Sequence, residues 1–167
     1  ALAARRRAAE SLPRSPAGVH GPRETVELRL ASELAAAGRP DEALQLYAAL
    51  AAQLPGATRV IVARSDVRWA TGQREAAAAD LEAAVKQAQG VPAHRRTEYV
   101  TTLRQQLIAR YAELGRHRQV VDQYQELINR DPRRDLVDQA FTYARAHGGL
   151  DERLVDTPAG PRILDEV

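Results

Sequence analysis

The sequence predicts an all-α fold, an α-solenoid of about 3.5 helix-turn-helix repeats. Apolar residues recur at helical spacing along most of the chain. Glycines interrupt these stretches at intervals of 34, 43 and 34 residues, at Gly38, Gly72, Gly115 and Gly149. Similar residue types return at fixed offsets from each glycine, which is the signature of stacked helical pairs.

Composition excludes several classes of protein. The 167 residues contain no cysteine, which excludes disulfide frameworks, thiol nucleophiles and iron–sulfur clusters. No apolar run approaches the ~20 residues that a membrane span needs, so we expect a soluble segment without membrane insertion. All 24 basic residues except Lys86 are arginine, a bias typical of a GC-rich genome, which favours a bacterial protein of the cytoplasm or periplasm.

Charge is more informative along the chain than in total. The net charge of +2 is too small for a nucleic-acid-binding surface, so we do not expect nucleic acid as a partner. Residues 1–23 carry +4, whereas residues 24–57 carry −3. Blocks of opposite sign either attract each other in successive layers, meet charged partners, or are ordinary solvated faces.

Residues 1–23 lie outside the repeats. We expect a helix rich in alanine and arginine over residues 1–11, followed by a linker rich in proline and glycine. The three consecutive arginines of that helix also resemble the cytoplasmic flank of a membrane helix, so the chain could be tethered through sequence outside it.

The first repeat, residues 24–57, is the clearest helical hairpin. Leu30 and Leu34 share one face of its first helix, and Tyr47 and Leu50 share one face of its second. The glycine between them ends the first helix in a left-handed conformation, and a proline two residues later begins the second.

The second repeat, residues 58–91, departs from this pattern, because Arg64 and Arg68 stand where apolar residues are expected. We favour a helix rotated by about one residue, whose inward residues are Val60, Ala63, Val67 and Ala70. Alternatively, the arginines pair with a carboxylate of Asp66, Asp80 or Glu82. A third alternative is an anionic ligand held with the help of Arg59.

The third repeat, residues 92–134, is the longest. Its first helix is expected to run from Ala93 to Leu114, about two turns longer than its neighbours. The extra end carries Arg95 and Arg96, and it is either a solvated helix end or a docking surface for an acidic partner.

The fourth repeat, residues 135–147, is partial, and residues 148–167 form a tail. Counted from Gly149, its inward residues include Arg145. Counting from Gly148 instead places Ala140 and Ala144 inward, so the register is open by one residue.

The same offsets recur in three repeats, as Leu30, Leu34, Gly38, Ala43, Tyr47, Leu50 and Pro55, then as Gly72, Ala77, Leu81 and Ala84, and then as Leu107, Tyr111, Gly115, Val120, Tyr124, Leu127 and Pro132. This pattern resembles the tetratricopeptide repeat (TPR) family over residues 24–147. The resemblance implies a right-handed solenoid whose first helices line a concave groove. It also implies that a peptide or helix of another protein lies in that groove.

The resemblance also implies which residues face the groove. They are Leu28, Ser32, Arg59, Val62, Asp66, Trp69, Thr102, Gln105, Ala109 and Tyr143. Trp69 has the profile of a binding hot spot, although it could equally be a core residue. Contacts to an anion or an acidic partner would come from Arg64, Arg68, Arg95 and Arg96.

No pattern indicates catalysis. The four histidines have no metal-ligand spacing, and no nucleophile elbow, phosphate loop or calcium loop is present. We therefore expect no enzyme, no catalytic residue, no metal and no cofactor. We expect a scaffold or adaptor that binds a partner protein. The alternatives are a regulatory or targeting segment of a larger enzyme, signalling or membrane-anchored protein, or a self-assembling subunit.

Overall fold

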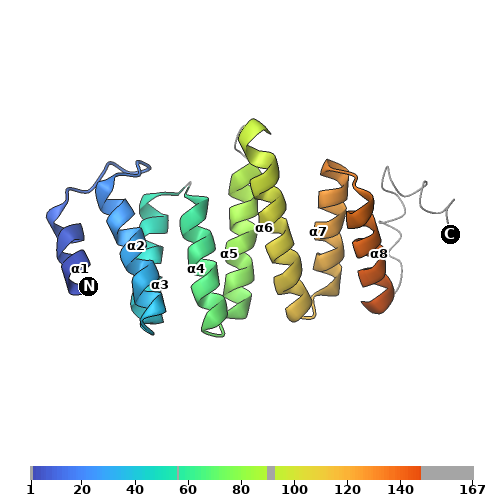
Figure 1. Cartoon of the computed structure of the whole chain (residues 1–167), viewed down its shortest axis with the longest axis horizontal. Coiled ribbons are helices and arrows are strands. Elements are labelled where there is room, and N and C mark those ends of the chain that lie inside the picture. Colours follow the sequence, from blue (N-terminus) through green and yellow to red (C-terminus); the bar gives the residue numbers. More distant parts are fainter. Residues whose placement is uncertain (1, 56, 90–92, 148–167) are drawn as a thin grey trace. The chain divides into compact units, whose positions relative to one another are not determined.

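The computed structural model describes residues 2–55, 57–89 and 93–147, without the side chains of residues 89 and 93–98. These ranges form eight α-helices and no strand, which confirms the all-α prediction (Figure 1). The helices are α1 (Leu2–Ser11), α2 (Pro22–Ala36), α3 (Pro40–Gln53), α4 (Thr58–Ala70), α5 (Arg74–Gln89), α6 (Ala93–Glu113), α7 (His117–Arg130) and α8 (Arg134–His147). The chain divides into two compact units, Ala1–Val91 (unit 1) and Pro92–Val167 (unit 2).

Three of the predicted corner glycines lie between helices, with left-handed φ angles of 74° at Gly38, 82° at Gly72 and 68° at Gly115. At each corner the glycine N–H donates to the carbonyl three residues earlier, at 3.1 Å. The following N–H donates to the carbonyl five residues earlier, at 2.8–2.9 Å. This pair of bonds is the Schellman motif, which satisfies the last carbonyls of a helix and reverses the chain.

A small side chain follows each corner by five residues. These side chains are fully buried, and they are Ala43, Ala77 and Val120. Their N–H groups make the first hydrogen bonds of the second helices, at 3.0–3.2 Å, to the carbonyls of Arg39, Gln73 and Arg116. The three corners therefore share both their backbone bonding and the packing of the residue that follows.

The core of unit 1 lies between consecutive helices. Each helix packs against the next, and α2 also contacts α4. The inward residues predicted for the first repeat are at most 2 % exposed and share one cluster, namely Leu30, Leu34, Tyr47 and Leu50. Burying a side chain of this size contributes about 1.5–3 kcal/mol.

The rotated register predicted for α4 is only partly correct. Val60 and Val67 are buried, as it requires, but Ala70 is exposed. Ile61 and Ser65 are buried as well, and the Ser65 hydroxyl donates to the Ala77 carbonyl at 2.8 Å. The reason is that α4 packs against both α3 and α5, so it buries a wider stripe than one rotated face.

The segment between α1 and α2 is anchored on the buried carboxylate of Glu24. The Ser15 N–H donates to this carboxylate at 3.1 Å and the Ser15 hydroxyl at 2.9 Å. The Gly21 N–H donates at 3.0 Å and the side-chain amide of Gln53 at 2.5 Å. Burial alone would raise the pKa of Glu24, but hydrogen bonds from its own backbone, Ser15 and Gly21 outweigh it and lower the pKa to about 2.

Unit 2 is built from α6, α7 and α8, and α7 packs against both of the others. With 21 residues against 14 in each of the others, α6 is longer by the two turns predicted, and its start extends beyond α7 (Figure 1). Ala140 and Ala144 are buried while Arg145 is exposed. The register counted from Gly148 is therefore correct and the one counted from Gly149 is wrong. The tail, residues 148–167, lies outside the described residues.

Candidate partner-binding surface

Six of the predicted groove residues lie in unit 1, on two helices that contact each other. Leu28 and Ser32 are on α2, and α4 carries Arg59, Val62, Asp66 and Trp69. None of the six is fully buried, and three are exposed outright, namely Ser32, Arg59 and Asp66. These six residues of α2 and α4 are here called the α2–α4 surface.

Leu28 and Ser32 also serve the packing of α2. Leu28 is partly buried against the core of unit 1. The hydroxyls of Ser32 and Tyr47 lie 3.0 Å apart, and Ser32 also donates to the Leu28 carbonyl at 3.2 Å. Because Tyr47 is almost fully buried, this hydrogen bond connects the surface of α2 to the interior of the hairpin.

Arg59 contacts a histidine of the segment that precedes α2. One terminal nitrogen of its guanidinium lies 3.2 Å from Nε2 of His20. A guanidinium can only donate, so Nε2 of His20 is the acceptor in this hydrogen bond. Spacing in the sequence gave no signal for this pair, because the two residues are 39 positions apart.

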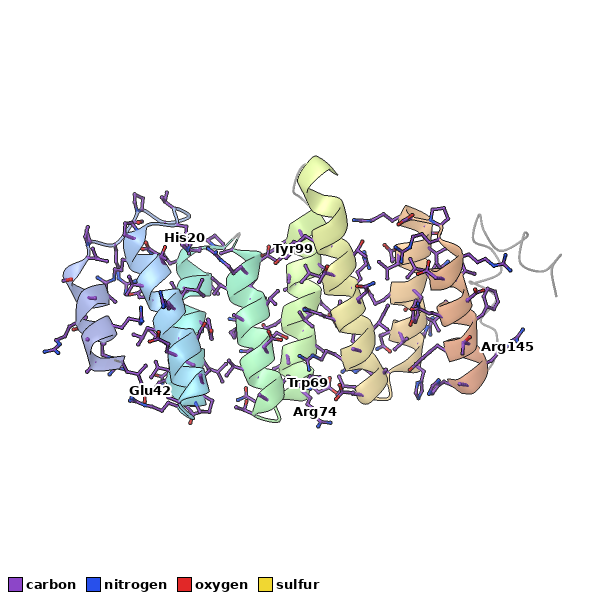
Figure 2. The ribbon with its side chains drawn as sticks, in the orientation of Figure 1. His20, Glu42, Trp69, Arg74, Tyr99 and Arg145 are labelled. Atoms are coloured by element: carbon purple, nitrogen blue, oxygen red, sulfur yellow. The ribbon has the colours of Figure 1, made fainter. Side chains whose placement is uncertain are left out.

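Trp69 lies at the corner between α4 and α5, where the Arg74 guanidinium stands over its ring (Figure 2). The distance from the guanidinium carbon to the ring centroid is 5.3 Å, which is a cation–π contact. Trp69 is half-buried. A partner that uses the ring face as an anchor must therefore displace or share Arg74.

Arg64 and Arg68 converge on Asp80 of α5, one of the carboxylates proposed from the sequence. Arg64 makes two hydrogen bonds to it, at 3.0 and 2.6 Å, and Arg68 makes one at 2.9 Å. Asp80 is buried, and the two arginine side chains are 19 % and 27 % exposed. Rotation of α4, the favoured interpretation, therefore does not account for the two arginines, and the alternative in which they pair with Asp80 does. The carboxylate stands where an anionic ligand would otherwise bind.

The predicted groove residues of unit 2 are on α6 and α8. Thr102, Gln105 and Ala109 are exposed on α6, and their spacing of three and four residues puts them on one face. Arg104 of the same helix is buried instead. Its guanidinium donates to Gln123 at 2.7 Å and to Glu126 at 3.0 Å. Burial lowers the pKa of Arg104.

Tyr143 belongs to a cluster of aromatic rings between α7 and α8. Its hydroxyl lies 2.8 Å from Nδ1 of His117, and its ring stacks on His147 with centroids 4.2 Å apart. The two histidine rings also stack, at 4.4 Å. Burial raises the pKa of the Tyr143 hydroxyl, and nearby Tyr124 raises it further. The phenol of Tyr143 therefore keeps its proton at neutral pH.

Arg95 and Arg96 are in the first turn of α6, where side chains lie outside the described residues, so their predicted contact with an acidic partner stays a prediction. Among the described residues, no three His, Asp or Glu side chains are placed to hold a metal ion. In the same part of the chain, no helix combines the length and apolar character that a bilayer span requires.

Two sequence comparisons, with protein families and with curated proteins, give no match. No protein-family model matches the chain, and no curated protein is significantly similar to it in sequence. The assignment of a function therefore depends on the residues and contacts described above.

Proposed function

We propose that this chain is a TPR-like helical repeat and acts as a non-enzymatic scaffold or adaptor, which holds a peptide or helix of a partner protein. The observation that carries the proposal is the triple recurrence of one corner. Gly38, Gly72 and Gly115 share the same left-handed conformation and the same two backbone hydrogen bonds. Each is followed at the same offset by a buried small residue.

Recurrence of this kind favours a binding function for a physical reason. A helical hairpin cannot bury its apolar flank alone, so hairpins associate side by side and leave the outer faces of their first helices open. Open helical faces with apolar and charged side chains are the surfaces on which peptides and amphipathic helices bind.

The composition of the α2–α4 surface fits such a ligand. Leu28, Val62 and Trp69 offer partly exposed apolar area. Exposed Arg59 and Asp66 on α4 carry opposite charges two turns apart. An apolar segment flanked by charges of both signs would be oriented by these two residues, because electrostatic complementarity sets register more than affinity.

The proposal is tested by site-specific crosslinking in cells that express the full chain. A photoreactive amino acid replaces Val62 on α4 and, as the matched control, exposed Ala48 on α3. We expect a discrete crosslinked partner from position 62 and none from position 48. The partner should be lost when Asp66→Arg and Arg59→Glu are combined.

A variant with Ala48→Glu should retain the crosslink from position 62. Equal crosslinking from both positions, or no effect of the α4 charge reversal on a chain whose circular dichroism is unchanged, would contradict a partner-binding role for the α2–α4 surface.

A further inference from the structure

The first helix, α1, is attached to the rest of unit 1 mainly by charge. Arg5 pairs with Glu33 of α2 at 2.7 Å, and Arg6 pairs with Glu42 of α3 at 2.9 Å. The side chains in these pairs are 27–50 % exposed, so water and salt screen them. These pairs join the positively charged residues 1–23 to the negatively charged residues 24–57.

The apolar contact made by α1 is small. Ala9 is its buried residue, and Leu2 is partly buried against the core of unit 1. Leu2, Arg5, Arg6 and Ala9 follow the spacing i, i+3, i+4, i+7, which puts the whole attachment on one helix face. The opposite face is exposed at Ala4 and Ala8 among others.

Open space borders α1 where it lies on α2 and α3. Two cavities of about 450 and 380 Å³ lie between α1 and the α2–α3 pair, and both are lined by Arg6, Glu10 and Leu30. Leu34 lines the first cavity and Leu46 the second. Leu30 and Leu34 are at most 2 % exposed with α1 in place, so the accessible walls of both spaces are mainly the charged side chains around them, including Arg6 and Glu10.

The connection to α2 is fixed by contacts that do not involve α1. Its fixed points are the Glu24 hydrogen bonds to Ser15 and Gly21, and a backbone bond from Gly18 to Gln53 at 2.8 Å. All of these lie C-terminal to α1. The helix can therefore leave its place by a change near Pro13 while the rest of unit 1 stays folded.

We propose that the α2–α3 face beneath α1 is a docking site for a basic, alanine-rich amphipathic helix of a partner protein, and that α1 is its resident, displaceable occupant. The partner helix carries an apolar residue, two adjacent arginines that reach Glu33 and Glu42, and a small residue one turn later. This site is separate from the α2–α4 surface and does not depend on the function proposed for it.

Competition with α1 sets the apparent affinity of the site. A ligand that binds only the open form has its affinity reduced by the fraction of chains in that form. Weakening the pairs made by Arg5 and Arg6 therefore strengthens binding of an added helix, whereas most substitutions near a binding site weaken it. This inversion separates a displaceable occupant from a purely structural helix.

The test uses the full chain and, as the probe, a fluorescent synthetic peptide of residues 2–14 followed by anisotropy. In the double variant Arg5→Glu with Arg6→Glu, the chain's own helix is repelled by Glu33 and Glu42. We expect this chain to bind the native peptide at least about tenfold more tightly than the unaltered chain does. Binding should weaken steeply in about 1 M salt.

Two reciprocal changes establish specificity. A peptide that carries the Arg5→Glu and Arg6→Glu changes should not bind the double variant. The same peptide should bind well to a chain that carries Glu33→Arg and Glu42→Arg. Arg118→Glu with Arg145→Glu, which alters the net charge equally at exposed positions of α7 and α8, should leave peptide binding unchanged.

Three results would overturn the proposal. The first is a double variant that binds the peptide no better than the unaltered chain, and the second is equal binding of native and charge-reversed peptides. The third is a concentration-dependent dimer of the unaltered chain that disappears in the double variant, since sedimentation would then assign the site to α1 of a second copy. Faster hydrogen exchange of the α1 amides in the double variant verifies that α1 has left the α2–α3 face.

Discussion

Arg64 and Asp80 are joined by two parallel hydrogen bonds across the α4–α5 hairpin, Nε to Oδ2 at 3.0 Å and Nη2 to Oδ1 at 2.6 Å. Arg68 adds a third bond to Oδ2. Fork-to-fork pairing of this kind is the strongest geometry for an arginine–carboxylate contact. One buried carboxylate therefore compensates two guanidinium groups placed on the face that a helical repeat normally fills with apolar residues.

Asp80→Asn should be among the most destabilising polar substitutions in the chain. It leaves two partly buried guanidinium groups without a counter-charge. We expect a loss of about 2–3 kcal/mol in the free energy of unfolding, less than for a fully buried pair because both arginines retain contact with water. Urea unfolding followed by circular dichroism measures it. Glu82→Gln, at an exposed position of the same helix, should cost less than about 1 kcal/mol, and an equal loss from both would refute this role of Asp80.

The corner glycines should tolerate asparagine better than alanine. Gly72 has a φ of 82°, and a Cβ there would meet no atom within 4 Å, so the penalty comes from the backbone alone. We expect Gly72→Ala to cost about 1–2 kcal/mol and Gly72→Asn less, because asparagine enters the left-handed region more readily. Equal thermal midpoints for the two variants would argue against a conformational origin.

The folding stability of the chain should depend on pH through Glu24. Its pKa is about 2 in the folded chain and 4.5 ordinarily, so its stabilisation is fully present above pH 4.5 and is lost as the pH falls through about 2. Glu24→Gln should lower the melting temperature at neutral pH, and the gap to the unaltered chain should narrow between pH 4.5 and 2. Glu10→Gln, at an exposed position, is the control. A gap that stays constant with pH would exclude ionised Glu24 as its source.

The same site sets a steric requirement at Gly21. A Cβ on this residue would overlap the Ser15 hydroxyl that donates to Glu24. Gly21→Ala should therefore destabilise the chain although its φ is −116°, in the region open to all residues. Combining it with Ser15→Ala should cost less than the sum of the two changes, which a double-mutant cycle of unfolding free energies measures.

Arg104 should be replaceable by an apolar residue. Its Nε is buried without a hydrogen-bond partner, and Glu126 is 55 % exposed, so removal of the charge strands no buried carboxylate. We expect Arg104→Met to change the free energy of unfolding by less than about 1 kcal/mol or to raise it. Arg104→Ala should cost more than Arg104→Met, because it also removes the packed methylene stem. A loss of more than about 2 kcal/mol for Arg104→Met in urea unfolding would show that the charge itself stabilises α6 on α7.

The sequence predicted those parts of the fold that depend on residues close together in the chain. Gly38, Gly72 and Gly115 end helices through bonds that span only five residues, and the inward places of Leu30 and Leu34 follow from helical spacing. The sequence left three carboxylates as partners of Arg64, and Asp80 was one of them. The sequence could not choose among them, because 16 residues separate Arg64 from Asp80 and the corner geometry decides which turn of α5 faces α4.

Side-chain contacts between distant segments had no comparable signal. The contacts of His20 with Arg59 and of His117 with Tyr143 join residues 39 and 26 positions apart. Arg104 looks like any exposed arginine of an amphipathic helix, and its burial depends on Gln123 and Glu126 of α7. The assignment of the groove residues as a binding surface stays a prediction.

The sequence by itself determined the helix ends at the three glycine corners and the inward stripes of the first repeat, since backbone conformation and 3.6-residue periodicity act within a few residues. Only the tertiary structure decided how the chain accommodates Arg64, Arg68 and Glu24 away from water. A charge is tolerated in the interior when a partner from another segment arrives at hydrogen-bonding distance, and that arrival depends on how whole helices pack.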